Sequence, residues 1–457
     1  MSGRGRGTTI PANRSWVAQD GHRRRKALRH EGHMDVLELH ACETAWAIVD
    51  TLYFDSSRHR FVRGDIEIEG RRIARILPPH TSQCACLMPG DTTACLPGLI
   101  EADATPGLQD WNRYSQQLAA HAVTTAGVFC RSLADCAACD GAHGLRRLFY
   151  VELAEDDGSA NRAEAGVRML EGIARATNSS RLECCEFIPA VVPGEVGSAA
   201  TLVAAAQVAE RLERRLCVRL SSTAADAKLY KESRYFTEVG LLSYLSLMSR
   251  ATIFNLSQLS RRDVAMVNES AANLVCAPGA VSECLQEEHF ARLSLKDRAL
   301  AFSSDRHTAV RGTCYRSLTL LSSALTHQSG KAATLGNFMV DALTSSAAQA
   351  LGIVDIGRIA ADMQADLCLF DRPEGFAENA GSWDFIDLIT YSEPRDVLIG
   401  GMPITRGRAA ALGSEESYAR THPYSTIDIA EYEHVQCDGR RTGAGQAQEF
   451  PVRGSRL

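Results

Sequence analysis

Apolar and polar residues alternate near both ends of the chain. Between residues 61 and 76 the period is two, interrupted at Gly64 and Gly70, which is typical of two short strands joined by a tight turn. Further short apolar runs separated by turn residues lie at 356–360, 365–371, 397–401 and 403–404. We therefore expect one small β-sandwich domain built from both chain ends, over residues 41–90 and 354–415.

Between these two regions, apolar runs of strand length alternate with segments of helical period. The runs are Leu96–Ile100, Thr124–Cys130, Leu148–Leu153, Glu186–Val192, Leu216–Leu220, Thr252–Phe254, Asn273–Cys276 and Ala299–Ser303. Ala199–Leu212 and Tyr235–Met248 are predicted to be helices. Eight strands in alternation with helices predict an α/β fold, a (β/α)8 TIM barrel over residues 91–353. Functional residues of such a barrel follow the carboxyl ends of its strands.

Composition agrees with a large folded chain and excludes several classes of protein. Of 457 residues, 45% are hydrophobic and 23% charged, both ordinary for a globular protein. A net charge of −6 gives no reason to expect a nucleic-acid partner. No apolar run approaches the roughly 20 residues of a membrane span, so we expect no membrane association. Fifteen cysteines in a chain this long predict reduced, buried thiols.

The two ends differ from the middle. Residues 1–40 are strongly basic and predict a disordered leader, with a nuclear or organellar signal as the alternative. Residues 416–457 are polar and Gly-rich, which predicts a disordered tail. That tail ends in Ser455-Arg456-Leu457, similar to the Ser-Lys-Leu peroxisomal address. We expect an intracellular protein of a peroxisome-type organelle, or otherwise a cytoplasmic one.

Three separated motifs carry a family resemblance. They are Pro97-Gly98-Leu99-Ile100, the helix Ala342–Gly352, and Gly357-Arg358-Ile359 followed by Ala365-Asp366-Leu367. On these motifs the chain resembles the amidohydrolase superfamily, most closely its guanine deaminase and chlorohydrolase-like branch, from about residue 44 to 412. The resemblance implies a zinc or iron site held by His-x-His after strand 1, a His after strand 5, a His after strand 6 and an Asp after strand 8. It also implies a proton-shuttling Glu after strand 5.

The sequence departs from this ligand pattern almost everywhere. The residues at the matching positions are Asp103 and Thr105 after strand 1, Arg219 and Ser222 (the Glu position) after strand 5, Asn255 and Gln258 after strand 6, and Asp305 after strand 8. No histidine lies between His143 and His289, so a shifted alignment does not restore the ligands of strands 5 and 6. We therefore predict that the family's zinc or iron site is absent and that no cofactor is bound.

Arg219 is the most informative of these replacements. A guanidinium does not lose its proton in proteins, so Arg219 in the barrel mouth is predicted to take the place of the cation and pair with Asp103 or Asp305. A weakly held Mg²⁺ between these two carboxylates is the alternative. Glu101 is expected to be a surface carboxylate, and Trp111 and Tyr114 are expected to pack rather than bind a ligand.

Two functions remain open. The first is a pseudoenzyme that keeps the barrel and serves as a binding, regulatory or structural subunit. It would form a homodimer or a heteromer with an active relative, and its small-molecule ligand is unknown. The alternative is a divergent hydrolase acting on non-peptide C–N bonds of a cyclic amidine or purine-like substrate. Its acid and base would come from Asp103, Asp305 and His307.

Overall fold

The computed structural model describes residues 45–104, 111–131, 135–136, 144–152, 185–194, 199–277, 293, 298–303 and 332–404. Several predicted features lie outside these residues: the leader 1–40, the tail 416–457 with Ser455-Arg456-Leu457, and the site residues Thr105, Asp305 and His307. In the part of the chain that is described, no helix is long and apolar enough to cross a membrane.

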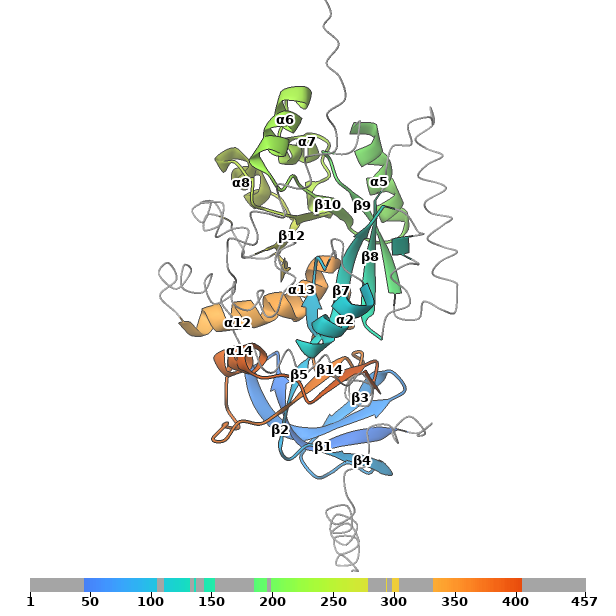
Figure 1. The fold of residues 1–457 in the computed structure, drawn as a ribbon, viewed down its shortest axis with the longest axis vertical. Coiled ribbons are helices and arrows are strands. Elements are labelled where there is room, and N and C mark those ends of the chain that lie inside the picture. The colour runs from blue at the N-terminus through green and yellow to red at the C-terminus, as the bar shows by residue number, and fades with distance from the viewer. Residues whose placement is uncertain are drawn as a thin grey trace, which may run out of the picture. The chain divides into compact units, whose positions relative to one another are not determined.

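The eight predicted barrel strands form one parallel sheet, sheet B (Figure 1). In order around the sheet they are β6 (Leu99–Glu101), β7 (Val123–Cys130), β8 (Arg146–Glu152), β9 (Cys185–Val191), β10 (Leu216–Arg219), β11 (Ala251–Phe254), β12 (Asn273–Cys276) and β13 (Leu300–Phe302). The Ala102 N–H donates to the Phe302 carbonyl at 3.3 Å and so joins the two ends of the sheet. The (β/α)8 barrel predicted from the apolar runs is confirmed.

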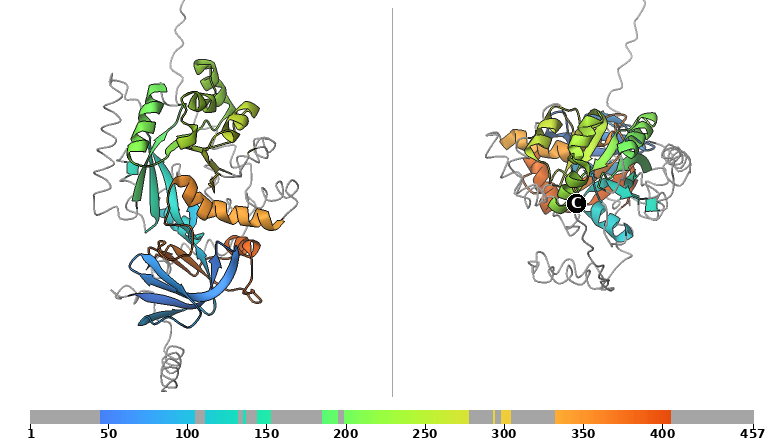
Figure 2. Two further views of the ribbon diagram at one scale, coloured as in Figure 1. Left: turned by 180° about the vertical axis from the view of Figure 1, so that it is seen from behind. Right: turned by 90° about the horizontal axis from the view of Figure 1, so that it is seen from above.

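Helices follow the strands along the outside of this barrel. They are α2 (Trp111–Ala120), α5 (Ala199–Arg211), α6 (Ala224–Arg234), α7 (Glu238–Tyr244), α8 (Arg261–Asn268), α12 (Ala332–Leu343) and α13 (Ser345–Leu351). The amphipathic α5 packs on β9 and β10 (Figure 2). The helix predicted over Tyr235–Met248 is wrong at both ends, because Tyr235 is left-handed and a 3-10 turn begins at Met248. The helix predicted over Ala342–Gly352 is interrupted at Thr344, whose backbone is non-helical.

Strands from both chain ends form a second, mixed sheet, sheet A (Figure 1). Its strands are β1 (Trp46–Asp55), β2 (Arg60–Glu69), β3 (Arg72–Leu77), β4 (Cys86–Pro89), β5 (Thr93–Pro97), β14 (Leu367–Asp371), β15 (Asp396–Ile399) and β16 (Met402–Pro403). β14 pairs antiparallel with β5 over five residues, which joins the two ends of the chain. A helix, α14 (Ser382–Tyr391), packs on α12.

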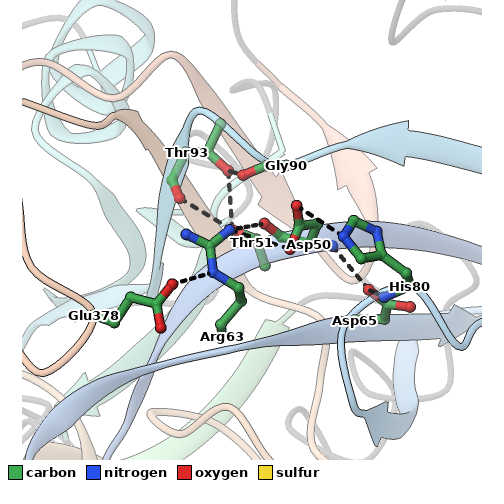
Figure 3. Close-up of polar contacts among 8 residues, drawn as sticks. All are labelled: Asp50, Thr51, Arg63, Asp65, His80, Gly90, Thr93 and Glu378. Carbon is green, nitrogen blue, oxygen red and sulfur yellow. Dashed lines mark hydrogen bonds and ion pairs between the residues drawn. The ribbon is translucent and has the colours of Figure 1, made fainter.

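Asp65 is a fully buried carboxylate that organises the loops of sheet A (Figure 3). It accepts the backbone N–H groups of Asp50, His80, Thr81 and Ser82 at 2.8–3.0 Å. Four N–H donors satisfy both oxygens of a charge that would otherwise be costly to bury. These contacts account for the burial of Asp65.

Gly98 is the point where the chain leaves sheet A and enters the barrel. The sequence predicted one strand over Leu96–Ile100, but the structure divides it into β5 and β6, and β5 belongs to sheet A although it lies past the predicted boundary at residue 90. A Cβ at Gly98 would lie 2.0 Å from Oγ1 of Thr124. Only glycine fits between the two sheets at this position.

Asp366 fastens the same junction from the other side. Its carbonyl accepts the Gly98 N–H at 2.9 Å, and its carboxylate binds Arg146 of β8 through two hydrogen bonds of 2.9 and 3.2 Å. Both side chains are buried, and a two-pronged guanidinium–carboxylate contact is strong and directional. The base of the barrel is therefore tied to sheet A by a charge pair.

The oxidation state of the described cysteines agrees with the sequence prediction, with one exception. Eight cysteines of the described residues carry free thiols, all but Cys84 buried. Cys86, however, is disulfide-bonded, so the prediction of reduced thiols is wrong at this position.

We expect Gly98→Ala to lower the free energy of unfolding by about 1–3 kcal/mol, because the added methyl group overlaps Thr124 in a packed core. Urea unfolding followed by circular dichroism measures the change. Gly194→Ala is the control, since its Cβ would lie 3.7 Å from Oγ of Ser221, an ordinary contact. Equal stability of the two variants would show that the close approach at Gly98 is not a constraint.

Candidate functional site

The sequence-predicted site residues that the structure describes gather where strands β6, β10 and β11 end. Asp103 follows β6 by two residues, Arg219 is the last residue of β10, and Asn255 is the first residue after β11. Ser222 lies in the loop after β10 and is exposed, and Gln258 lies in the loop after β11. Since β10 and β11 are neighbours in the sheet and β6 closes it, these positions surround one end of the barrel.

Arg219 and Asp103 form an ion pair across the barrel mouth. Nη2 of Arg219 donates to both oxygens of Asp103, at 2.6 and 2.5 Å. Only 7% of the Arg219 side chain and 13% of the Asp103 side chain are exposed, so the pair is largely removed from solvent. The sequence prediction that Arg219 points into the mouth and pairs with Asp103 or Asp305 is confirmed for Asp103.

The guanidinium of Arg219 also packs on the face of an aromatic ring inside the barrel. The Arg219 guanidinium carbon lies 3.8 Å from the ring centroid of Phe129 on β7, which is a cation–π contact. In the described part of the chain, Arg219 thus contacts the Asp103 carboxylate and the Phe129 ring. The side chain is thereby held in a fixed orientation.

Glu101 is a second carboxylate at this site, and the expectation that it is a surface residue is wrong. It is 4% exposed, and its Oε1 accepts the Asp103 N–H at 3.1 Å. Glu101 therefore fixes the backbone that carries Asp103. No sequence pattern indicates this burial, because a carboxylate at the end of a short strand is usually solvated.

Three large rings fill the barrel below the ion pair. Phe129 of β7, Tyr150 of β8 and Phe254 of β11 contact one another, with centroid separations of 4.7–5.1 Å. They are 7%, 0% and 1% exposed. β7 and β8 lie far from β11 in the order of the sheet, so rings from opposite sides of the barrel meet in its interior. The apolar runs predicted these strands, but not that aromatic residues would meet here.

Tyr150 is part of this filling rather than an acid or base. Its hydroxyl donates to the Ala102 carbonyl at 2.8 Å. Burial raises the pKa of Tyr150 well above its ordinary value, and the nearby Cys217 and Asp103 raise it further. Gly127 leaves room for the hydroxyl, since a Cβ there would lie 2.2 Å from it. The phenol stays protonated and acts as a fixed donor.

The polar residues after strands 5 and 6 bind the main chain. Asn255 is left-handed, with φ of 62°, and its Nδ2 donates to the Leu220 carbonyl at 3.0 Å. Ser257 donates to Oδ1 of Asn255 at 3.0 Å. Gln258 donates to the Ser222 carbonyl at 3.2 Å. These side chains therefore hold the two adjacent loops together.

Glu238 is a buried carboxylate beside the site that sequence reasoning missed. Glu238 lies 16 residues after Ser222 in the chain. Its two carboxylate oxygens nevertheless accept the N–H and the hydroxyl of Ser221, the residue before Ser222, at 2.9 and 3.1 Å. Glu238 is 7% exposed. Burial raises its pKa, and the two hydrogen bonds from Ser221 oppose that shift. The contact fixes the loop directly after Arg219.

The described donors at this mouth do not fit the zinc or iron that the resemblance implies. Asp103 binds a guanidinium, Asn255 binds a carbonyl, and Ser222, which the resemblance matches to the proton-shuttling Glu, is an exposed serine. Among the described residues, no group of three or more His, Cys, Asp or Glu side chains is arranged to hold a metal ion. The remaining positions of the predicted set, Thr105 and Asp305, lie outside these residues, as does His307.

Trp111 and Tyr114 behave as expected at the start of α2. They are 6% and 4% exposed and their ring centroids are 5.9 Å apart. Both belong to the hydrophobic core between the barrel strands and the helices. The interpretation of these rings as packing residues is confirmed.

No family profile matches this sequence, and no curated protein matches it in a sequence comparison. Solved structures do match the fold. Atrazine chlorohydrolase from Arthrobacter aurescens TC1, complexed with zinc, is 13% identical with a TM-score of 0.63, covering 82% of this chain and 98% of that one. An adenosine deaminase from Xanthomonas campestris with bound zinc is 16% identical with a TM-score of 0.64, covering 83% and 98%.

Aminofutalosine deaminase from Helicobacter pylori, in complex with methylthio-coformycin, is 12% identical with a TM-score of 0.59, covering 79% of this chain and all of that one. These three enzymes are amidohydrolases. The present chain has the amidohydrolase fold, as its motifs predicted.

Arg219→Ala is expected to destabilise the protein by up to about 3–5 kcal/mol, because it leaves the Asp103 carboxylate largely buried without its counter-charge. Thermal unfolding of the purified chain measures the loss. The double variant Asp103→Asn/Arg219→Met is the control, since removing both charges together costs less than removing one. A melting temperature of Arg219→Ala equal to that of the parent would show that the pair does not form.

The raised pKa of Glu238 predicts a pH dependence of stability. Because the folded protein holds the proton of Glu238 more tightly than the unfolded chain does, this residue makes stability fall as pH rises above the ordinary glutamate pKa of 4.5. Glu238→Gln removes this pH dependence. The melting temperature of the variant should therefore rise relative to that of the parent as the pH approaches neutrality. Glu232→Gln, at an exposed position, should run parallel to the parent. Parallel curves for both variants would contradict the prediction.

Proposed function

We propose that this chain is a pseudoenzyme of the amidohydrolase fold, in which the Arg219–Asp103 ion pair takes the place of the catalytic metal. In this proposal the barrel is a packed scaffold, and the protein works by binding other molecules. The observation that carries the proposal is the guanidinium of Arg219 itself, buried between Asp103 and the Phe129 ring.

Electrostatics opposes a metal ion beside this guanidinium. A single positive charge and a divalent cation about 4 Å apart repel by about 8 kcal/mol at an effective dielectric constant of about 20. Asp103 is paired with Arg219, so its negative charge is already balanced by this contact. A metal would therefore have to displace Arg219 from a site where its side chain is only 7% exposed.

The aromatic filling supports the same proposal. A metal-dependent hydrolase needs room at the barrel mouth for an attacking water and a substrate. Here Phe129, Tyr150 and Phe254 are buried and in mutual contact, and the Phe129 ring lies under the guanidinium of Arg219. The solved structures with this fold are hydrolases and deaminases, so the proposal is that this chain keeps their scaffold with a different interior.

Metal content and activity together test this proposal. The purified full chain is loaded with Zn²⁺ or Fe²⁺, dialysed and analysed by mass spectrometry, then assayed with guanine, adenosine and atrazine. We expect far less than one metal per chain and no turnover. One tightly held transition metal per chain that is lost in Asp103→Asn, with turnover of any of these substrates, would favour the divergent hydrolase and overturn the proposal.

A further inference from the structure

Three exposed aromatic side chains lie on α7 and on the turn that joins α6 to it. Tyr235 is 91% exposed, Phe236 40% and Tyr244 73%. The rings of Phe236 and Tyr244 lie against each other, with centroids 5.5 Å apart, and Tyr235 is the neighbour of Phe236 in the chain. We call these three residues the aromatic patch. In the 11-residue α6 only Tyr230 is buried, so most of this helix faces outward.

Tyr235 is held outward by an unusual backbone conformation. It caps the carboxyl end of α6 with φ of 62° and ψ of 4°, the left-handed region, and its N–H donates to the Lys231 carbonyl. Glycine is the usual residue at this position because a Cβ is strained there. A tyrosine that is 91% exposed gains little packing in return. The fold therefore does not explain why an aromatic residue stands at this cap.

Basic side chains border the aromatic patch. Thr237 donates to Asp263 at 2.5 Å, which brings the start of α8 next to the start of α7, as Figure 1 shows. Arg261 and Arg262, the first residues of α8, therefore lie at the same end as Tyr235 and Phe236. Arg261, Arg262 and Lys231 are all exposed. Within the described residues, no ion pair links these three to a carboxylate.

The acidic groups of this region are engaged elsewhere. Asp226 accepts a hydrogen bond from Thr223 at the far end of α6, Glu232 lies 3.8 Å from Lys228, and Glu238 is buried. On α6 and at the start of α8 the basic residues Lys228, Lys231, Arg234, Arg261 and Arg262 outnumber the exposed carboxylates Asp226 and Glu232, so this surface is positive although the whole chain carries a net charge of −6. A positive, apolar surface on a negative protein is complementary to an acidic partner.

We propose that the aromatic patch and its basic border dock an acidic peptide segment of a partner protein that also carries apolar side chains. Aromatic and arginine side chains are the residues that contribute most to binding at protein interfaces. A second copy of this chain docked face to face would place like charges against each other, which disfavours self-association here. The net negative charge likewise opposes a nucleic acid strand. The proposal does not depend on whether the barrel holds a metal.

Binding is measured by fluorescence anisotropy with the full chain and a labelled synthetic peptide of Glu, Leu and Phe. We expect saturable binding that weakens with salt. A peptide in which Ser replaces Leu and Phe should bind more weakly, and oligothymidylate should not compete. Arg261→Glu/Arg262→Glu and Tyr244→Ser should each weaken binding about tenfold. Tyr391→Ser is the matched control, since Tyr391 is 76% exposed on α14, and should change affinity by less than about twofold.

Tyr235→Gly separates binding from folding. Because glycine accepts the left-handed conformation, this variant should keep or raise the melting temperature while weakening peptide binding. No binding by the parent chain, equal loss in Tyr391→Ser, or tighter binding of oligothymidylate would overturn the proposal. None of these results measures the metal content, so the pseudoenzyme proposal is tested separately.

Discussion

The ion pair between Arg219 and Asp103 is the contact on which the interior of this barrel depends. Each charge is largely buried, so each requires the other. Glu101 fixes the backbone of Asp103, Phe129 lies under the guanidinium, and Glu238 anchors the loop that follows Arg219. Loss of any one of them would expose the pair to rearrangement. Across the described ranges, these contacts form one small network around the ion pair.

A barrel of this kind separates the requirements of packing from those of chemistry. Strand alternation and the rings of Phe129, Tyr150 and Phe254 build the interior, and Asp366 and Gly98 join it to sheet A. None of these contacts needs a metal. In the proposed pseudoenzyme, the fold is stable because packed rings and a charge pair supply what a metal centre and its ligands would supply in an enzyme.

If the barrel interior holds no catalytic site, as in the proposed pseudoenzyme, the function of the protein is carried by its surface. Among the described residues, the region that departs most from what folding requires is the end of α6, where a left-handed, exposed Tyr235 stands beside basic residues that form no ion pair within this part of the chain. In the proposed pseudoenzyme, this surface would carry the binding function. This contrast links the proposed function with the proposed docking surface.

The sequence by itself determined the eight barrel strands and the sheet from both chain ends, because apolar runs and motif spacing are local properties. It also placed Arg219 in the mouth opposite Asp103. It did not determine the break at Gly98, the burial of Glu101, the contact of Glu238 with Ser221 or the meeting of three rings. Each of these depends on residues distant in the chain approaching within a few ångströms, which only the closed barrel decides.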